Sequence, residues 1–72
     1  MLKIGEFSKL SRVSVRMLRH YDQKGLLTPS EIDPMTGYRY YSENHLSQVF
    51  RITALKDLGF SLAAIREILT IY

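Results

Sequence analysis

Apolar residues recur at helical spacing in four segments of this 72-residue chain. The first spans about residues 5–10 and the second about 14–24, with a very short connection between them. Two further segments follow at about 42–58 and 61–70. Intervals of three and four residues place the apolar side chains on one face of a helix. The pattern predicts four amphipathic helices, the first two joined by a tight turn.

Polar and glycine residues mark the ends of these helices. Ser14 and Ser61 stand at N-cap positions, where a hydroxyl accepts a backbone N–H of the first turn, and we expect Ser42 to cap the third helix in the same way. Gly25 and Gly59 supply the left-handed residue that commonly ends a helix. The apolar faces then give an expected core, which comprises Phe7, Leu10, Val13, Val15, Leu18, Tyr21, Leu26, Leu27, Leu46, Val49, Phe50, Ile52, Leu55, Leu62, Ile65, Ile68 and Leu69.

The spacing changes from helical to alternating between the second and third helices. Pro29 stops a helix, and residues 30–32 and 38–41 have the composition of two short strands around an Asp-Pro…Gly turn. Alternation places Tyr38 and Tyr40 on one side of the hairpin and Arg39 on the other. A two-stranded ribbon is only marginally stable alone, so it must lean on a helix. A hairpin in this position, at about residues 28–41, is a wing.

Charge is unevenly distributed along the chain, whose net charge is +3. Residues 1–27 carry six Lys and Arg against two acidic residues, a balance of +4, whereas residues 28–72 carry four against five, a balance of −1. This asymmetry favours a polyanionic partner. On the second helix, one face carries Arg16, Arg19, His20 and Gln23. A helix with such a face suits the major groove of DNA and its phosphates, although a solvated amphipathic helix has the same pattern.

Other classes of function find little support in the sequence. His20 and His45 lie on different predicted helices without a third zinc ligand at suitable spacing, and no phosphate-binding Gly-rich loop or activated nucleophile is present. We therefore expect no catalytic residues, no metal and no cofactor in this chain. The absence of Cys fits a reducing compartment, and no apolar run is long enough to span a bilayer.

Five stretches of the sequence occur together in one known family. They are residues 4–11 (IGEFSKLS), 13–22 (VSVRMLRHYD), 25–29 (GLLTP), 37–41 (GYRYY) and 55–62 (LKDLGFSL). In this order they resemble the amino-terminal DNA-binding domain of the MerR family of bacterial transcription regulators. The resemblance implies a mainly helical winged helix-turn-helix fold, four helices plus a two-stranded wing. It covers residues 1–72, with the helix-turn-helix at about 5–24, the wing at about 28–41 and a second helix pair at about 42–70.

The resemblance also implies which residues meet DNA. Arg19 and Tyr21 match a recognition-helix arginine and aromatic, with the Tyr21 ring expected to be half in the core. Arg39 matches a wing arginine on phosphate, Tyr38 the tyrosine beside it, and Lys56 lies in a second phosphate-facing stretch. The expected DNA-binding residues are Ser14, Val15, Arg16, Arg19, His20, Tyr21, Tyr38, Arg39 and Lys56. His20 and Met17 depart from the commonest pattern, which has Tyr and Thr there, so a family base preference does not carry over.

The family pattern extends beyond this domain. Members bind pseudo-palindromic promoters as homodimers and distort the DNA, so the expected partners are operator DNA in the bacterial cytoplasm and a second subunit of the full-length protein, with any effector ligand bound by a C-terminal region. Apolar Ile71 and Tyr72 lead us to expect a dimerisation helix after residue 72. Two alternatives remain open at this point. One is an architectural, excisionase-like DNA-binding protein without an effector domain, and the other is a winged helix used for protein interaction.

Overall fold

The computed structural model describes residues 1–71, and Tyr72, with the expectation attached to it, lies outside the described residues. Four helices are present in this part of the chain: α1 (Ile4–Ser11), α2 (Val15–Gln23), α3 (Asn44–Asp57) and α4 (Leu62–Ile71). Three short strands accompany them: β1 (Leu2–Lys3), β2 (Glu31–Ile32) and β3 (Arg39–Tyr41). The mainly helical fold with a hairpin wing is therefore confirmed, with helix ends within two residues of those predicted.

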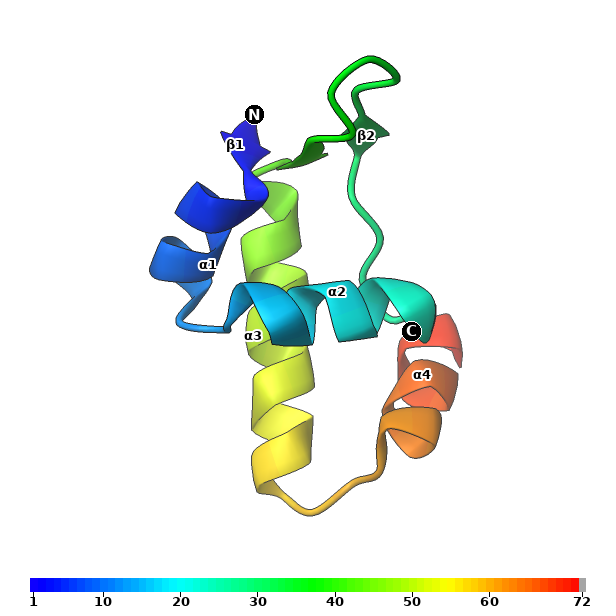
Figure 1. Cartoon of the computed structure of the whole chain (residues 1–72). Coiled ribbons are helices and arrows are strands. Elements are labelled where there is room, and N and C mark those ends of the chain that lie inside the picture. Colours follow the sequence, from blue (N-terminus) through cyan, green and yellow to red (C-terminus); the bar gives the residue numbers. More distant parts are fainter. Residues whose placement is uncertain (72) are drawn as a thin grey trace.

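The longest helix, α3, is the support on which the other elements pack. Figure 1 shows α2 crossing α3 at a steep angle, α1 beside the first half of α3, and α4 returning on the other side after the turn at residues 58–61. The wing projects from the end of the molecule that also holds β1. This arrangement leaves one long side of α2 uncovered along its length, between the wing and the α3–α4 turn.

The two-stranded wing is present as β2 and β3, and β1 adds a third strand to its sheet, which the sequence did not predict. The sheet is antiparallel with the order β1-β3-β2, and Leu2 is paired with Tyr41 while Ile32 is paired with Arg39. Two residues are too few to show an alternating pattern, so β1 had no signal of its own. Its pairing gives the marginal ribbon a third strand and ties the wing to the start of α1.

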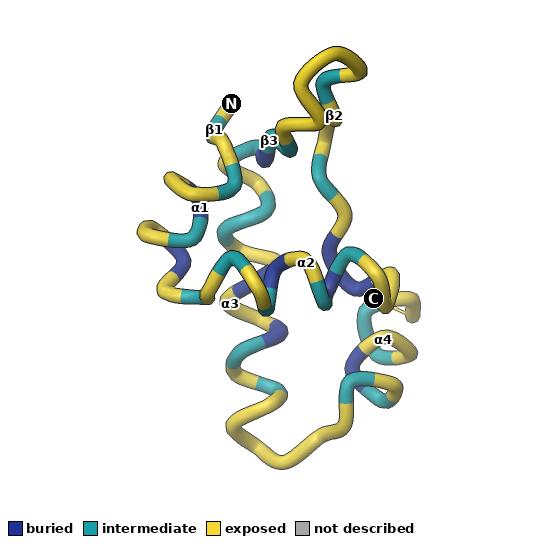
Figure 2. The backbone as a smooth tube through the Cα atoms, in the orientation of Figure 1, coloured by how far each residue is buried: buried dark blue, intermediate teal, exposed yellow. Residues whose placement is uncertain are grey.

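Most buried side chains belong to α1, α2, β3 and α3, and the dark segments in Figure 2 lie mainly below the mostly exposed wing in this view. The rings of Phe7 and Tyr41 stack, with centroids 4.6 Å apart. The core residues with less than a tenth of their surface exposed are Phe7, Leu18, Tyr21, Leu26, Leu27, Tyr41, Val49, Ile52 and Ile65.

Two expected core residues are instead exposed. Leu10 and Phe50 keep 56% and 52% of their surface in solvent. Helix α3 buries a narrow seam through Val49 and Ile52, and Phe50 lies next to that seam rather than on it. A chain of this length has too few elements to surround a helix, so an apolar pattern overstates how much is covered.

Capping follows the prediction at two helices and differs at the third. Ser14 Oγ accepts a hydrogen bond from the Met17 N–H at 3.1 Å, and Ser61 Oγ accepts one from Ala64 at 3.2 Å. Ser42 does not cap α3 in this way. Its N–H donates to Nδ1 of His45 at 3.0 Å, and its hydroxyl lies 2.9 Å from the same nitrogen. The imidazole of His45, in the first turn of α3, therefore bonds back to Ser42, before the helix, and no side chain of the described residues caps α3.

Left-handed residues end three of the helices. Gly25 and Gly59 have φ of +70° and +97°, as their positions after α2 and α3 predicted. After α1 this conformation falls on Arg12, with φ of 60°, the one non-glycine residue with positive φ among those described. The turn between α1 and α2 is therefore built around an arginine in a conformation that usually selects glycine or asparagine.

Candidate nucleic-acid interface

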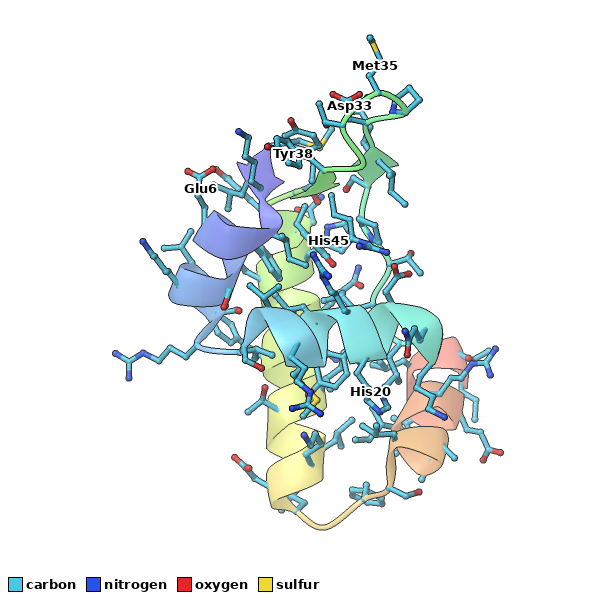
Figure 3. All side chains as sticks on the ribbon, viewed as in Figure 1. Glu6, His20, Asp33, Met35, Tyr38 and His45 are labelled. Carbon is cyan, nitrogen blue, oxygen red and sulfur yellow. The ribbon has the colours of Figure 1, made fainter. Side chains whose placement is uncertain are left out.

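Helix α2 has one face in the core and an opposite face in solvent. Leu18 and Tyr21 are buried, whereas Arg16, Arg19 and Gln23 are exposed. His20, which we placed on the same face, is half-buried and is therefore less accessible than its three neighbours (Figure 3). At the start of α2, Ser14 Oγ accepts the N–H of Met17, so the cap engages one amide of the first turn. The exposed strip offers cations and hydrogen-bonding groups along one side of a helix.

Tyr21 is more deeply buried than its sequence suggested. Only 1% of its surface is exposed, so the ring is a core residue rather than one half in the core. Its hydroxyl accepts a hydrogen bond from Lys56 Nζ at 3.4 Å, and the same ammonium lies 5.6 Å from the ring centroid. Lys56 is exposed near the end of α3. Tyr21 thus holds a cation from α3 beside α2, and Lys56 is the accessible member of the two.

A shallow cavity of about 270 Å³ lies next to this lysine. Arg12, Ser14, Met17, Lys56 and Asp57 contribute to its wall. It combines the start of α2 with two cations, one from the helix-turn-helix turn and one from α3. Arg12 was not among the expected site residues, because a turn residue has no helical face by which to place it.

The tip of the wing is an ordered turn organised by Asp33. Its carboxylate accepts hydrogen bonds from the N–H of Met35 at 2.8 Å and of Thr36 at 3.4 Å. The Met35 bond is the main reason that the pKa of Asp33 lies below its ordinary value of 3.8. Met35 itself is 94% exposed at the end of the hairpin. The turn therefore holds an extended, solvated tip clear of the helices.

The sequence placed Arg39 on phosphate at the wing, but the structure gives it a protein partner. Its Nε donates to Oδ2 of Asp22 at 3.3 Å, and the two side chains retain 31% and 21% of their surface in solvent. Arg39 begins β3, near the foot of the wing rather than at its tip. Tyr38, just before it, is 53% exposed, and Lys3 Nζ lies 5.0 Å from its ring centroid.

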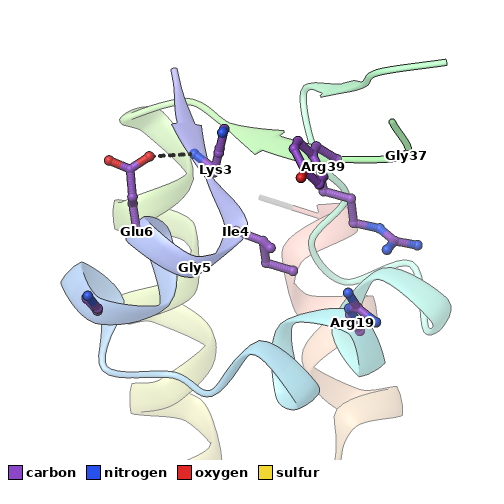
Figure 4. Close-up of a pocket in the computed structure, with 9 residues that line it drawn as sticks. Lys3, Ile4, Gly5, Glu6, Arg19, Gly37 and Arg39 are labelled. Atoms are coloured by element: carbon purple, nitrogen blue, oxygen red, sulfur yellow. Dashed lines mark hydrogen bonds between the residues drawn. The ribbon is translucent and has the colours of Figure 1, made fainter. Parts of the chain in front are cut away.

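A larger cavity of about 400 Å³, here called the wing cavity, separates the wing from the helices. Lys3, Lys9, Arg19 and Arg39 line it together with Glu6 and the backbone of Gly5 and Gly37. Figure 4 shows Arg19 reaching it from α2 and Arg39 from β3. Glu6 accepts the Lys3 N–H at 3.4 Å, so this acid is engaged at the start of α1. Four cations from α1, α2 and the sheet therefore border one hollow beside the exposed face of α2.

Tyr41, at the end of β3, is buried in the core. Its hydroxyl is buried and lacks a hydrogen-bond partner among the described residues. Burial raises the pKa of this hydroxyl above its ordinary 10.0, the negative charge of Asp22 adds to that shift, and Arg39 and Arg19 partly oppose it. All three charged groups thus act on one buried oxygen.

Other kinds of site find no counterpart in the described part of the chain. No three His, Cys, Asp or Glu side chains of residues 1–71 lie close enough to hold a metal ion. In the same residues, every helix is too short or too polar to cross a membrane. The sequence missed Lys3, Arg12 and Asp22 as members of the interface. Lys3 and Arg12 add to the basic charge of the first 27 residues, which was the only signal that included them.

The fold and this basic face define a winged helix-turn-helix domain of the DNA-binding class. Residues 2–70 match the family described as MerR HTH family regulatory protein. The chain therefore belongs to the MerR family of transcription regulators, and it is the sequence-specific, non-enzymatic DNA-binding domain of that family.

Three similar proteins place the domain in context. The multidrug-efflux transporter 1 regulator of Bacillus subtilis is 42% identical over 64 residues, which are 89% of this chain and 23% of that protein. The crystal structure of MtaN, the N-terminus of the Bacillus subtilis multidrug transporter activator, has a TM-score of 0.87 at 38% identity and covers 96% of this chain and 64% of its own. A cryo-EM structure of an EcmrR–DNA complex has a TM-score of 0.85 at 40% identity and covers 97% and 25%. The chain spans between about a quarter and a half of the length of the first curated relatives that it matches.

Proposed function

We propose that α2 enters the major groove of duplex DNA and that the cationic hollows on either side of it meet the flanking phosphates. The observation that carries this proposal is the position of Arg16, Arg19 and Gln23 on the uncovered side of α2, between the wing cavity and the smaller cavity at Lys56. The major groove admits one helix, and the backbones on its two sides are then within reach of the neighbouring elements.

The contacts divide by chemistry. Lys3, Arg39 and the backbone of the wing fix the register on one phosphate chain, and Arg12 with Lys56 does so on the other. Arg16 and Gln23 on the exposed face of α2 read base edges, because guanidinium and amide groups make bidentate bonds to purines. Arg19, which lines the wing cavity, faces the phosphate chain on the wing side. Ser14, Val15 and His20 are expected at the margin of the same contact. Tyr21 supports it from the core through Lys56.

For the full-length regulator, we propose a homodimer acting on a pseudo-palindromic promoter with distortion of the DNA, and an effector bound by its C-terminal region. The support is that EcmrR, 40% identical over this domain, is described in a complex with DNA, and that MtaN belongs to a protein described as an activator. A two-fold operator mirrors a two-fold protein, so half-site spacing in a selected sequence is the observable consequence.

Fluorescence anisotropy with labelled duplex DNA tests the interface. Replacement of Arg16 and Arg19 together by Ala should weaken binding at least about tenfold, since each lost guanidinium contact costs about 1–3 kcal/mol. The double change Arg51→Ala with Arg66→Ala is the matched control. It also removes two positive charges, from exposed sites on α3 and α4 that line a different hollow, and it should change affinity little. Equal losses in both variants would mean that net charge, and not this face, binds DNA.

Selection from a pool of random duplexes tests sequence specificity. The full-length protein should enrich two inverted half-sites, and the 72-residue chain should enrich a single half-site. Recovery of unrelated sequences by both would contradict the proposal.

A further inference from the structure

Asp22 is an acidic residue in the middle of a surface that is otherwise set up for an anionic partner. It lies on the last turn of α2, between the exposed arginines of that helix and the wing. On electrostatic grounds a carboxylate there repels phosphate. Its presence weakens DNA binding unless Asp22 also makes a contact that favours binding. What it does in the structure is accept the Nε–H of Arg39 at 3.3 Å.

That hydrogen bond engages only the Nε of Arg39. The two terminal nitrogens of the guanidinium have no hydrogen-bond partner among the described residues, and the side chain borders the wing cavity. Figure 4 shows this guanidinium and that of Arg19 on the same side of the cavity, approaching from two different elements. A guanidinium held at Nε still presents two N–H groups in a plane, which is the geometry that a phosphate accepts bidentately.

The surroundings of Tyr41 agree with this grouping of Asp22, Arg39 and Arg19. The buried hydroxyl of Tyr41 has its pKa raised by burial and by Asp22, and lowered by Arg39 and Arg19, so all three charges lie within electrostatic reach of one atom. Two arginines brought this close repel each other. A carboxylate between α2 and β3 offsets that repulsion and ties the wing to the helix.

We propose that Asp22 is a positioning residue for DNA binding, which fixes Arg39 through Nε so that its terminal nitrogens and Arg19 together receive one backbone phosphate at the wing cavity. The proposal rests on the proposed function of this face. Ordering a long side chain before contact removes part of the entropy cost that binding would otherwise include. Asp22 therefore strengthens the phosphate contact of Arg39 by ordering the side chain, although its own charge repels phosphate.

The sign of one substitution separates this role from simple charge. Asp22→Asn keeps the size of the side chain, removes the charge and weakens the bond to Arg39 Nε, since a neutral amide oxygen is a poorer acceptor than a carboxylate. If Asp22 only repelled phosphate, the variant would bind DNA more tightly. If it positions Arg39, the variant should bind about threefold to tenfold more weakly, the range set by freeing one rotamer-rich side chain.

The experiment measures affinity for a labelled duplex of mixed sequence, because a phosphate contact does not depend on the operator. Asp22→Asn, Arg39→Gln and the double variant form a cycle. With Gln at position 39, the Asp22→Asn change should leave affinity unchanged or improve it. Glu67→Gln is the matched control, since this exposed acid on α4 lies outside both cationic hollows beside α2 and has no ion pair among the described residues. It should bind as tightly as the parent or more tightly.

Two further measurements test whether the variants fold and whether the Asp22–Arg39 ion pair is lost. Thermal unfolding shows that the variants are folded, and the Nε–H resonance of Arg39 in ¹H–¹⁵N spectra reports the ion pair without DNA. This resonance should shift in Asp22→Asn and not in Glu67→Gln. Tighter binding by Asp22→Asn, an equal loss in both Arg39 backgrounds, or an unchanged Arg39 resonance would overturn the inference while leaving the DNA-binding function intact. Failure of the parent chain to bind any duplex would instead remove the proposed function itself.

Discussion

The hydroxyl of Tyr41 is a buried polar group without a partner among the described residues. Its ring is well placed, stacked on Phe7 and edge-on to His45 at 5.6 Å. Tyr41→Phe keeps the ring and removes the unpaired oxygen, so we expect the free energy of unfolding to rise by about 1 kcal/mol. Urea unfolding measures this change. The control is Tyr40→Phe, at a half-exposed neighbour, which should have little effect.

The same residue predicts how stability changes in alkali. Its folded pKa lies above the ordinary 10.0, so the stability linked to its neutral form is present below pH 10 and decreases as the pH rises above it. Between pH 9 and pH 11, the parent should therefore lose more stability than Tyr41→Phe. Identical losses in the two proteins would show that Tyr41 ionises as easily in the folded state as in the unfolded chain.

Tyr21 behaves as core, in contrast to the exposed arginines of its helix. Tyr21→Ala should lower the free energy of unfolding by about 3–5 kcal/mol, because it leaves a cavity where α2 meets α3. Arg16→Ala should change it by less than about 0.5 kcal/mol, since the side chain is exposed. Thermal and urea unfolding of both variants test the contrast. If Arg16→Ala proved the more damaging, the orientation of α2 would be wrong.

At the scale of elements, the wing depends on a turn rather than on packing. Asp33→Ala removes the acceptor for the N–H of Met35 and Thr36, so hydrogen exchange at these two amides should quicken while the helices stay protected. Because the pKa of Asp33 is lowered, the turn is fully supported above pH 3.8 and weakens as the pH falls through the folded value. The Met35 amide shift in the parent should titrate with a midpoint below 3.8. Unchanged exchange in Asp33→Ala would show that the strands alone hold the turn.

Sequence alone predicted the elements well because their ends carry local chemistry. Ser14 and Ser61 cap the starts of α2 and α4. Gly25 and Gly59 follow the ends of α2 and α3 in the left-handed conformation. These positions agree with the helices that the apolar spacing predicted. Strand β1 was not predictable, since its pairing with β3 joins residues about forty positions apart and leaves no local pattern. His45 as the partner of Ser42 was also missed, because imidazole is not a common capping group.

The exposed residues of α2 could be predicted from the sequence, but the contacts that join α2 to other elements could not. Helical spacing placed Arg16 and Arg19 in solvent, as found. It could not show that Arg39 contacts Asp22, because that ion pair joins a helix to a strand across 17 positions. The burial of Tyr21 was underestimated for a similar reason. How deeply a ring sits depends on the helix that crosses it, and crossing angles are not readable from one segment.

The whole molecule should bind DNA in a strongly salt-dependent way. Each neutralised phosphate releases counterions, so a plot of log affinity against log salt should fall by about 0.9 per contact. Lys56→Ala should reduce the magnitude of this slope by about 1, whereas Arg51→Ala should leave it unchanged. Anisotropy titrations at several salt concentrations supply the slopes. Equal slopes for the parent and Lys56→Ala would exclude Lys56 from the phosphate contacts.

The left-handed Arg12 between α1 and α2 sets a limit on how stable this domain can become without losing function. Glycine there would relieve backbone strain of about 1 kcal/mol. It would also delete a cation from the wall of the hollow shared with Ser14 and Lys56. Stability and affinity therefore compete at a single position. Directed evolution for heat resistance alone should replace Arg12 early, and selection for operator binding should keep it.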